Sequence, residues 1–451
     1  MSNSALLSSP VRTPDTRSPQ LMTKRAWWLV GLNVLIPGSA QAVAGNRRLG
    51  RFGLGSTLVL WLLLVITAVL YLFARTFLIG LLTNTIVLWL LVLGALFYAV
   101  LWIVLTLDTL RLVRLVRVAP AARAFVGGLS VAALVLVAGT AGYAAVTASA
   151  GIGLLDTVFS GGQIEPPVDG RYNILLLGGD AGPDRQGLRP DSLSVASVDA
   201  ESGEIVLFGI PRNLEQVPFV EGSPLYGPFP NGYDCGDECL VDYLYTYGQQ
   251  HPELYPDAEK NGSKPGVEAM RDAAEGVLGL TIQYYVLIDM QGFSQLIDAL
   301  GGIDVTVAER VPLGSNQYDD GSHAPAIGYI EAGPQHMNGE TALWYARSRY
   351  GTTDYARMSR QREVQEAIIA QANPANVLTN FVAIAGAGAQ VVSTDIPQGM
   401  LSHFVDLGGK SREQPVVSID FVPPEVDVVN PDFDAIRARV RQALAPPQRE
   451  E

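Results

Sequence analysis

Several features that carry enzyme chemistry are scarce in this chain of 451 residues. It has only four histidines, and they are scattered along the sequence. It contains neither a Gly-x-Ser-x-Gly elbow nor a Gly-x-x-x-x-Gly-Lys phosphate loop. Those patterns position the nucleophile of a Ser-His-Asp hydrolase or hold nucleotide phosphates. Their absence disfavours both kinds of mechanism.

Acidic residues are almost missing from the first third of the chain. Residues 1–150 hold Asp15 and Asp108 against 12 lysines and arginines, a balance of +10, whereas residues 151–451 carry a balance of −23. A basic, apolar N-terminal part and an acidic C-terminal part suggest a membrane anchor that carries a domain in another compartment. Because nucleic acids attract clustered cations, the acidic back also argues against a nucleic-acid partner.

Cysteine is nearly absent as well. The two cysteines, Cys235 and Cys239, lie in Cys-Gly-Asp-Glu-Cys. Outside the cytoplasm this pair can close a small disulfide loop, which is the reading we favour. Free thiols are the second reading, and a zinc site is the third, because His251 alone adds too few ligands.

The N-terminal third of the chain contains long hydrophobic runs. Three are long enough to span about 30 Å of hydrocarbon, at residues 53–73, 78–107 and 124–148. Cations flank the first span and fill the loop between the second and third. By the positive-inside rule the loop before the first span and the loop between the second and third spans are cytoplasmic, so everything after about residue 150 is expected outside a membrane that the chain crosses several times.

A fourth apolar segment, residues 27–44, is interrupted by Pro37-Gly38. We interpret it as a re-entrant or interfacial hairpin, with a fourth span as the alternative. Residues 1–23 are polar and rich in Ser, Thr and Pro, so a disordered cytoplasmic tail is expected there, followed by a membrane region over residues 24–150.

The rest of the chain alternates between strand-length apolar runs and helical periodicity. We expect a linker over 151–170, an α/β catalytic domain over 171–375 with helices on both faces of a sheet, and an α/β extension over 376–451. The extension can complete the same layers or form a subdomain, and completion is favoured. The expected elements are strands at 172–177, 193–198, 205–209, 284–288, 303–307 and 416–421 and helices at 267–278, 291–300, 339–345, 358–372, 376–390 and 397–407, with a last helix after Asp432.

Two carboxylates follow or precede buried strands in this domain. Asp180 ends an apolar strand after two glycines, and Asp191 lies just before the next strand. Each also has a plain structural reading, as a turn aspartate and as a capping residue. Because Mg²⁺ uses one or two carboxylates together with phosphate oxygens and waters, the pair is a candidate Mg²⁺ site.

Arginines are concentrated in two places. Arg212 follows a buried strand directly, where it needs an anion or a structural salt bridge. Arg347 and Arg349 diverge by about 200° in a regular helix, so we expect them at a helix end or in an extended turn, where both can converge. Arg357 and Arg360 are three residues apart on one helix face, and a solvated charged face is the alternative reading. Several arginines opposite carboxylates suit a phosphate or pyrophosphate ligand.

In this order the motifs resemble the LytR-CpsA-Psr family of bacterial cell-envelope proteins. The resemblance runs from about Tyr172 to Ala372. It is carried by Asn173–Asp180, Arg189-Pro-Asp191, Gly209-Ile-Pro-Arg212, Ile288–Phe293, Ile297–Val305, Gly333–Glu340 and the arginine block from Ala342 to Gln361.

The resemblance implies a layered α-β-α domain, with a central mixed sheet covered by helices, behind a helical membrane anchor. It implies a Mg²⁺-dependent phosphotransferase that moves a glycopolymer from a polyprenyl-pyrophosphate carrier to the 6-hydroxyl of a muramic acid in peptidoglycan. The polyprenyl tail is expected in an apolar tunnel. The matching positions are Asp180 and Asp191 for Mg²⁺ and catalysis, and Arg189, Arg212, Arg347, Arg349, Arg357, Arg360 and Gln361 for pyrophosphate.

This chain departs from the family's usual pattern in three respects. Asn213 stands where Pro-Arg-Asp is usual, which removes a carboxylate and a charge partner for an arginine. The usual Arg-Ser-Asp-Thr reads Arg189-Pro-Asp191-Ser192. The segment between Asn213 and Val267 is also long, and it carries the cysteine pair.

The expected mechanism has Asp191, in preference to Asp180, accept the proton of the acceptor hydroxyl, while Mg²⁺ and the arginines neutralise the phosphate charge. A polyprenyl-pyrophosphate hydrolase is one alternative, with water as the acceptor. A non-catalytic module that binds lipid-linked glycan, or that regulates envelope genes, is another.

Overall fold

The computed structural model describes residues 12, 14–159, 162–180, 189–314, 325–350, 352–371 and 392–445, with the backbone alone at residues 75, 76, 154, 157, 180, 189 and 237. The chain divides into an N-terminal unit, residues 1–152, and a C-terminal unit, residues 153–451.

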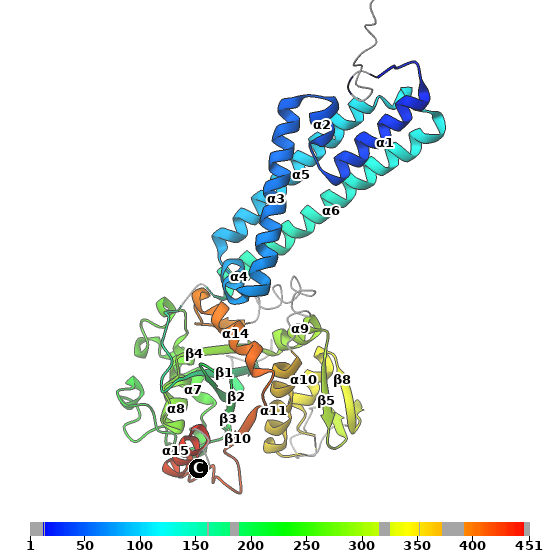
Figure 1. Ribbon diagram of the computed structural model, residues 1–451. Coiled ribbons are helices and arrows are strands. Elements are labelled where there is room, and N and C mark those ends of the chain that lie inside the picture. The colour runs from blue at the N-terminus through cyan, green and yellow to red at the C-terminus, as the bar shows by residue number, and fades with distance from the viewer. Residues whose placement is uncertain are drawn as a thin grey trace, which may run out of the picture. The chain divides into compact units, whose positions relative to one another are not determined.

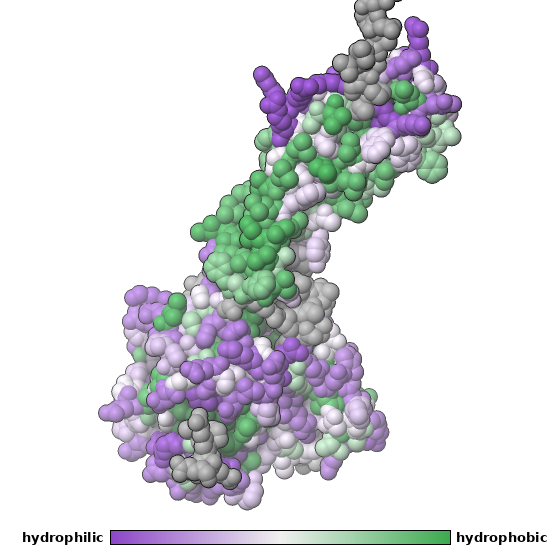
Figure 2. All heavy atoms as spheres, viewed as in Figure 1, coloured by the Kyte–Doolittle hydropathy of each residue, from purple (hydrophilic) through white to green (hydrophobic). Residues whose placement is uncertain are grey.

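Six α-helices begin in the described part of the N-terminal unit (Figure 1): α1 (Pro19–Leu35), α2 (Ser39–Ala44), α3 (Arg47–Phe73), α4 (Arg75–Leu82), α5 (Thr85–Val113) and α6 (Pro120–Val158). Three stretches are long and apolar enough to cross a membrane: Arg47–Phe73, Thr85–Arg117 and Pro120–Gly153. Figure 2 shows apolar residues covering the length of these helices and polar residues gathered at one end. The unit therefore has the composition of a membrane anchor.

The boundaries in this unit differ from the predicted ones. The second predicted span, residues 78–107, is broken because Asn84 caps α5 by accepting hydrogen bonds from the backbone N–H groups of Ile86 and Val87. Helix α6 continues to Val158, so the first part of the predicted linker is helical. Helix α1 begins at Pro19, where Ser18 accepts a hydrogen bond from Leu21 N–H, so the predicted tail ends before residue 23.

Residues 27–44 form a broken pair of helices and not one continuous span. Gly38 adopts φ +93°, and a Cβ there would lie 2.5 Å from Leu54 N. Polar contacts fix the pair on α5: Asn33 donates to Thr106 Oγ1 at 3.0 Å, and Gln41 donates to Leu105 O at 2.7 Å. The glycine at the Pro37-Gly38 break thus lets the backbone between α1 and α2 approach the backbone of α3 more closely than a side chain at residue 38 would permit.

The C-terminal unit is built on a mixed six-stranded sheet in the order β10-β3-β2-β1-β4-β9 (Figure 1). Strand β1 is antiparallel to β2 and parallel to β4, β3 is parallel to β10, and β4 is antiparallel to β9. The strands are β1 (Arg171–Asp180), β2 (Arg189–Asp199), β3 (Ile205–Gly209), β4 (Tyr284–Asp289), β9 (Val392–Thr394) and β10 (Val417–Asp420).

Helices cover both faces of this sheet, as predicted. On one face Leu175, Val195 and Phe208 pack in one apolar core with α7 (Tyr243–Gln250), α8 (Pro265–Leu278) and α15 (Phe433–Leu444). On the other face Ile174 and Leu207 pack against α14 (Leu401–Ser411). Because successive side chains of a strand point to opposite faces, each strand supplies both cores.

A smaller core joins the remaining elements beside the sheet. They are α9 (Met290–Leu300), β5 (Ile303–Val307), β6 (Val311–Leu313), β7 (Gly328–Ile330), β8 (Gly333–Met337), α10 (Gly339–Arg347) and α11 (Asp354–Gln371). Asp289 and Asn338 cap α9 and α10 by accepting from the N–H groups of Gly292 and Thr341. Gly301, in the left-handed region, ends α9 as predicted.

Residues 392–445 complete the layered domain, because β9 and β10 are the edge strands of the sheet. Asp420 of β10 accepts a hydrogen bond from the Arg362 guanidinium at 2.6 Å, which ties the sheet edge to α11. A Cβ at Gly209 would lie 1.9 Å from that Asp420 carboxylate, so the ion pair requires glycine at the end of β3. The helix predicted at 376–390 lies outside the described residues.

A buried charge cluster, here the Arg271 cluster, lies on α8 away from the ends of β1 and β2. Arg271 pairs with Asp395 and with Glu268. Asp272 accepts hydrogen bonds from Ser223 Oγ at 2.5 Å and Tyr255 Oη at 2.7 Å, and Glu275 accepts one from Ile282 N–H at 2.6 Å. The cluster therefore holds more carboxylates than guanidinium groups.

Candidate functional site

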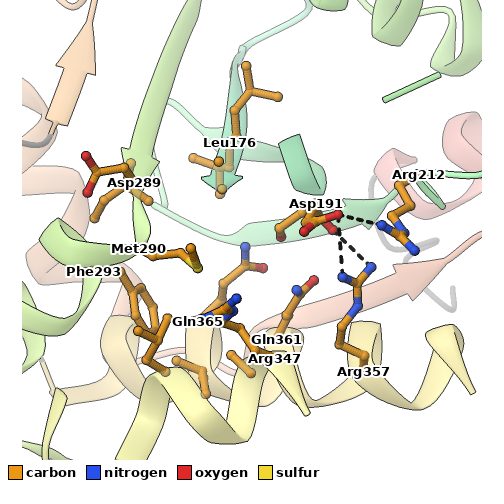
Figure 3. A pocket seen from close by; sticks show the side chains of 18 of the residues that line it. Leu176, Asp191, Arg212, Asp289, Met290, Phe293, Arg347, Arg357, Gln361 and Gln365 are labelled. Carbon is orange, nitrogen blue, oxygen red and sulfur yellow. Dashed lines mark hydrogen bonds and ion pairs between the residues drawn. The ribbon is translucent and has the colours of Figure 1, made fainter. Parts of the chain in front are cut away.

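A cavity of about 820 Å³ opens beside the C-terminal ends of β1 and β4 and under α9, α10 and α11 (Figure 3). In Figure 3 the charged residues Asp191, Arg212 and Arg357 lie on one side of it, and Met290 and Phe293 lie on the other side together with Asp289. Its polar part is lined by Asp191, Arg212, Arg347, Arg349, Asp354, Arg357, Gln361 and Gln365. Its apolar part is lined by Leu176, Val286, Ile288, Met290, Phe293, Leu296, Leu343, Trp344, Val364 and Ile368.

Asp191 is aimed into the polar part by an irregularity of strand pairing. Across β1 and β2, Gly178 pairs with Ser192 and Gly179 pairs with Pro190, so Asp191 is the extra residue of a bulge. A bulge bends its strand and re-aims a side chain. In Figure 3 the Asp191 carboxylate faces two guanidinium groups.

Arg212 follows β3 after Ile210-Pro211 and reaches two carboxylates. Its Nη1 donates to Asp191 Oδ1 at 2.6 Å, and its Nε donates to Asp354 Oδ2 at 3.2 Å. The structural salt bridge considered from the sequence is thus present. The same guanidinium lines the cavity and keeps 24% of its side chain exposed, so it is also available to a ligand there.

Arg357 lies behind the same two carboxylates, with only 3% of its side chain exposed. Its Nη2 donates to Asp354 Oδ2 at 3.0 Å and to the Asp191 backbone carbonyl at 3.2 Å, and its Nη1 lies 3.7 Å from Asp191 Oδ1. Its position on the first turn of α11 places it one turn from Asp354. The two aspartates and two arginines form one connected network.

Asp354 is a site residue that the sequence analysis missed. It is the first residue of α11, and it joins Arg212 to Arg357, with Arg349 Nη1 4.0 Å from its other carboxylate oxygen. An acid in a first helical turn, three residues before an arginine, was the available signal. That pattern is also common on exposed helices, so it did not stand out.

Arg347 and Arg349 both line the cavity although they are two residues apart. Helix α10 ends at Arg347, and Ser348 is extended at φ −56° and ψ 126°. The chain leaves helical geometry between the two arginines. This is the helix end that the sequence predicted.

Arg360 does not line the cavity, in contrast to the role expected for it. Its Nε donates to Tyr345 O at 2.9 Å, and its Nη2 donates to Ser348 O. These are carbonyls at the C-terminal end of α10, which have no partner within that helix. Arg360 therefore holds the turn that carries Arg347 and Arg349. Gln361, the next residue, lines the cavity, and its contact with pyrophosphate stays a prediction.

The electrostatics of the polar part favour an ionised Asp191. Burial raises the pKa of this carboxyl, but the charges of Arg357, Arg212 and Arg349 outweigh burial and hold the pKa below its usual value. Burial lowers the pKa of Arg357, with Arg212 and Arg349 adding repulsion. Crowded cations of this kind gain most from a ligand with several negative oxygens.

Two predicted site residues are described by their backbone alone. Asp180 is the last residue of β1 and Arg189 is the first residue of β2. The two pair with each other, next to the bulge at Asp191. Among the described residues no three His, Cys, Asp or Glu side chains gather in a metal-binding group. Mg²⁺ needs only one or two carboxylates when phosphate oxygens and waters complete its shell, and the carboxylate of Asp191 is of the hard oxygen type that it prefers.

The cysteines lie apart from the residues that line the cavity. Cys235 and Cys239 form a disulfide, with their Cα atoms 5.2 Å apart. Cys239 belongs to the core under α7 and α8. The disulfide closes a turn in the long segment between β3 and α8.

Comparisons with known proteins agree with this architecture. Residues 155–433 match the LytR_cpsA_psr family. The polyisoprenyl-teichoic acid–peptidoglycan teichoic acid transferase TagU of Halalkalibacterium halodurans is 28% identical over 227 residues, which are 50% of this chain and 61% of that protein. TagV of Bacillus subtilis, a transferase of the same name, is 27% identical over 253 residues, 55% of this chain and 56% of that protein.

Two solved structures are also similar to this chain. The crystal structure of B. subtilis TagV is 22% identical, with a TM-score of 0.44 over 62% of this chain and 100% of that one. A structure of TagT bound to LI-WTA is 19% identical, with a TM-score of 0.42 over 62% of this chain and 94% of that one. The family match itself spans more than half of the 451 residues, and this chain is a member of the LytR_cpsA_psr family.

Proposed function

We propose that this protein is a membrane-anchored phosphotransferase that moves a glycopolymer from a polyprenyl-pyrophosphate carrier to peptidoglycan. The observation that carries the proposal is the two-part cavity, in which four arginines adjoin a long apolar lining. A pyrophosphate attached to a prenyl chain has the matching two parts. Arginine is the side chain best suited to hold phosphate oxygens in pairs. Two relatives are named as transferases of teichoic acid that act between polyisoprenyl-teichoic acid and peptidoglycan.

In the proposed reaction the acceptor hydroxyl oxygen of muramic acid attacks the phosphorus that bears the glycan. A new P–O bond forms, the bond from that phosphorus to the bridging oxygen breaks, and polyprenyl phosphate leaves. The hydroxyl proton passes to a carboxylate, for which we propose Asp191. Arg212, Arg347, Arg349 and Arg357 neutralise the charge that builds on the phosphate oxygens.

The ion pairs of Asp191 give this assignment a physical basis. With no ligand, the arginines depress the pKa of Asp191, which makes it a weak base. A pyrophosphate that takes up the guanidinium groups lowers the positive field at Asp191 and raises its basicity. Asp191 therefore becomes an effective base when the donor is bound.

Mg²⁺ is proposed as the cofactor. Asp180 would hold it together with phosphate oxygens, and Asp191 would hold it through the carboxylate oxygen that does not accept the proton. The ion supplies charge neutralisation at the pyrophosphate when bound. Arg189 is proposed as a further pyrophosphate contact, because its backbone adjoins Asp180 at the end of the β1–β2 pair.

The proposed location is a bacterial cell membrane, crossed by the three apolar helices, with the C-terminal unit outside. Arg47, Arg48 and Arg51 lie in the first turns of α3, and Arg111, Arg114 and Arg117 lie in the last turn of α5 and just after it. Both of these helix ends are therefore favoured on the cytoplasmic side. A disulfide in the C-terminal unit suits an oxidising compartment.

The test uses the full-length protein in detergent with Mg²⁺, a short polyprenyl-pyrophosphate-linked glycan and a peptidoglycan fragment, with products identified by mass spectrometry. We expect a glycan joined to the fragment through a phosphate. Arg347→Ala should abolish it, and Arg412→Ala, an exposed arginine of another surface, should not. Carrier cleavage without joining would replace the transferase with a hydrolase, and an intact carrier that stays bound would indicate a binding module.

A further inference from the structure

Helix α11 presents a graded face to the cavity, from charged side chains through amides to apolar ones. The residues of α11 that line the cavity are Asp354, Arg357, Gln361, Val364, Gln365 and Ile368. Steps of three and four positions keep them on one side of the helix. Gln365 is the last polar residue of this series, and in Figure 3 it lies between Arg357 and Phe293. It therefore marks the place where the arginines give way to the apolar lining.

The side-chain amide of Gln365 has a fixed orientation. Its oxygen accepts a hydrogen bond from Arg362 Nη1 at 2.6 Å. A guanidinium group has N–H donors and no acceptor, so only the oxygen of the amide can face it. The amide nitrogen donates to Ser194 Oγ at 3.3 Å. Turning the amide over would set two donors against each other, which keeps the nitrogen on the side of Ser194.

Arg362 is itself held from outside the cavity. It is only 7% exposed and is not among the residues that line the cavity. Its Nη2 donates to Asp420 Oδ1 at 2.6 Å. Asp420 is the last residue of β10, and Ser194 belongs to β2. Two strands of the sheet thus set the orientation of the Gln365 amide, and no contact with a ligand is needed to hold it.

This arrangement leaves one N–H group of Gln365 for a ligand. An amide nitrogen carries two N–H groups, and Ser194 accepts one of them. Within the described part of the chain this nitrogen has no second hydrogen-bond partner. Since Gln365 lines the cavity, the second N–H group is available there. A fixed neutral donor beside an apolar lining suits an oxygen at the point where a ligand changes from charged to apolar.

The proposed donor has such oxygens on the phosphate that bears the prenyl chain. The chain belongs beside the apolar lining, and the glycan-bearing phosphate belongs beside Asp191, which accepts the proton. The prenyl-bearing phosphate then lies between them, where Gln365 lies on α11. This phosphate leaves with the electron pair of the bond that breaks, so its negative charge increases during transfer. A donor directed at it binds the transition state more tightly than the ground state.

We infer that Gln365 binds the prenyl-bearing phosphate through the N–H group that Ser194 does not use, and that Arg362 fixes the amide for this contact. The inference rests on the proposed function for the identity of the donor. It adds to the site a residue that the sequence motifs did not indicate.

The experiment measures how geranylgeranyl phosphate and geranylgeranyl pyrophosphate bind to the full-length protein in detergent, by calorimetry. Gln365→Leu removes the donor at similar size, and both ligands should bind about 10-fold more weakly, as expected for a hydrogen bond to a charged group. Gln365→Glu keeps an acceptor for Arg362 but places a carboxylate against the phosphate. It should bind both ligands more weakly than Gln365→Leu does.

Gln371→Leu is the matched control. It makes the same exchange on the same helix, at a glutamine whose amide binds the backbone N–H and carbonyl of Asp304. It should bind both ligands as wild type does. Melting temperatures establish that each variant is folded in the assay. In the transfer reaction, Gln365→Leu should lower kcat as well as donor affinity, because the contact strengthens as the phosphate leaves.

A purely structural role for Gln365 gives the opposite order of variants. The carboxylate of Gln365→Glu pairs with Arg362 more strongly than the amide does, so wild-type affinity of Gln365→Glu would overturn the inference. A loss confined to the pyrophosphate would also overturn it, since the monophosphate keeps the phosphate that Gln365 is inferred to bind. Absence of transfer in a wild type that binds both ligands, with the expected losses in the variants, would reject the transferase and leave the contact of Gln365 standing.

Discussion

Two clusters of arginines and aspartates in the C-terminal unit are built from the same types of side chain but differ in their surroundings. The site cluster, formed by Arg212, Arg349, Arg357, Asp191 and Asp354, borders a cavity. The Arg271 cluster is closed by protein: Asp395 pairs with Arg271 and accepts a hydrogen bond from Tyr285 N–H at 2.8 Å.

The balance of charge differs between the two clusters. Among the residues that line the cavity, arginines outnumber aspartates by one: Arg212, Arg347, Arg349 and Arg357 against Asp191, Asp289 and Asp354. Carboxylates outnumber the guanidinium in the Arg271 cluster, and burial raises the pKa values of Asp272 and Asp395. A surplus of cations at a cavity calls for an anionic ligand, whereas a surplus of buried carboxylates is relieved by binding protons. Charge balance and access together distinguish a binding site from a structural network.

The largest expected effect comes from opening the closed cluster. Arg271→Ala leaves Asp395 and Glu268 buried without their cation, and we expect a loss of about 3–5 kcal/mol in unfolding free energy. Denaturant unfolding followed by tryptophan fluorescence measures it. Transfer activity per folded molecule should stay within about two-fold of wild type. A loss below about 1 kcal/mol would show that the cluster is not a structural network.

The converse effect is expected in the site cluster. Arg357→Ala should lower the transfer rate by about 10²- to 10³-fold, as the loss of one preorganised donor to a developing charge does. Its unfolding free energy should fall less than that of Arg271→Ala, because water in the cavity can solvate Asp191 and Asp354. Arg357→Lys is the matched control, since it keeps the charge without the forked geometry. Equal activity of wild type and Arg357→Ala would remove Arg357 from the site.

The smallest effect depends on pH and concerns Glu275. Burial raises the pKa of Glu275 to about 7 from 4.5. The folded state therefore holds this proton more tightly than the unfolded state, and stability falls as pH rises from about 4.5 toward 7. Glu275→Gln keeps the acceptor for Ile282 N–H without ionising. Above pH 7 the variant should be more stable than wild type by about 1–3 kcal/mol, and near pH 4 the two should be equal. Parallel stability curves across this range would contradict the assignment.

Much of the fold was accessible from the sequence because its signals are local. The strands at 205–209 and 303–307 were predicted with the observed bounds, and Gly301 was identified as the end of α9. Arg347 and Arg349 were placed at a helix end from their spacing alone. In each case periodicity or a turn residue acts within a few positions.

The parts that were missed depend on contacts between distant segments. Asp354 becomes a partner of Arg212 only when α11 folds beside the chain that follows β3. Arg360 shares a helix face with Arg357, but the end of α10 lies close enough to bind its guanidinium. The break before α5 was overlooked because only three polar residues, Thr83-Asn84-Thr85, interrupt the apolar run there. The spacing of residues along a helix predicts which of them share a face. It does not predict which residues of another segment that face contacts.

The edge strand β10 has a consequence for how this domain is made. Strand β3 has β2 on one side, and its other side is covered by β10, whose first residue comes about 210 residues later in the chain. At a synthesis rate of roughly 5–20 residues per second, that edge of β3 stays open for about 10–40 s in every new molecule. Exposed strand edges are templates for pairing with other chains. A chain that is cut before Val417 keeps this edge open permanently, so shortened versions of the protein are expected to aggregate during production.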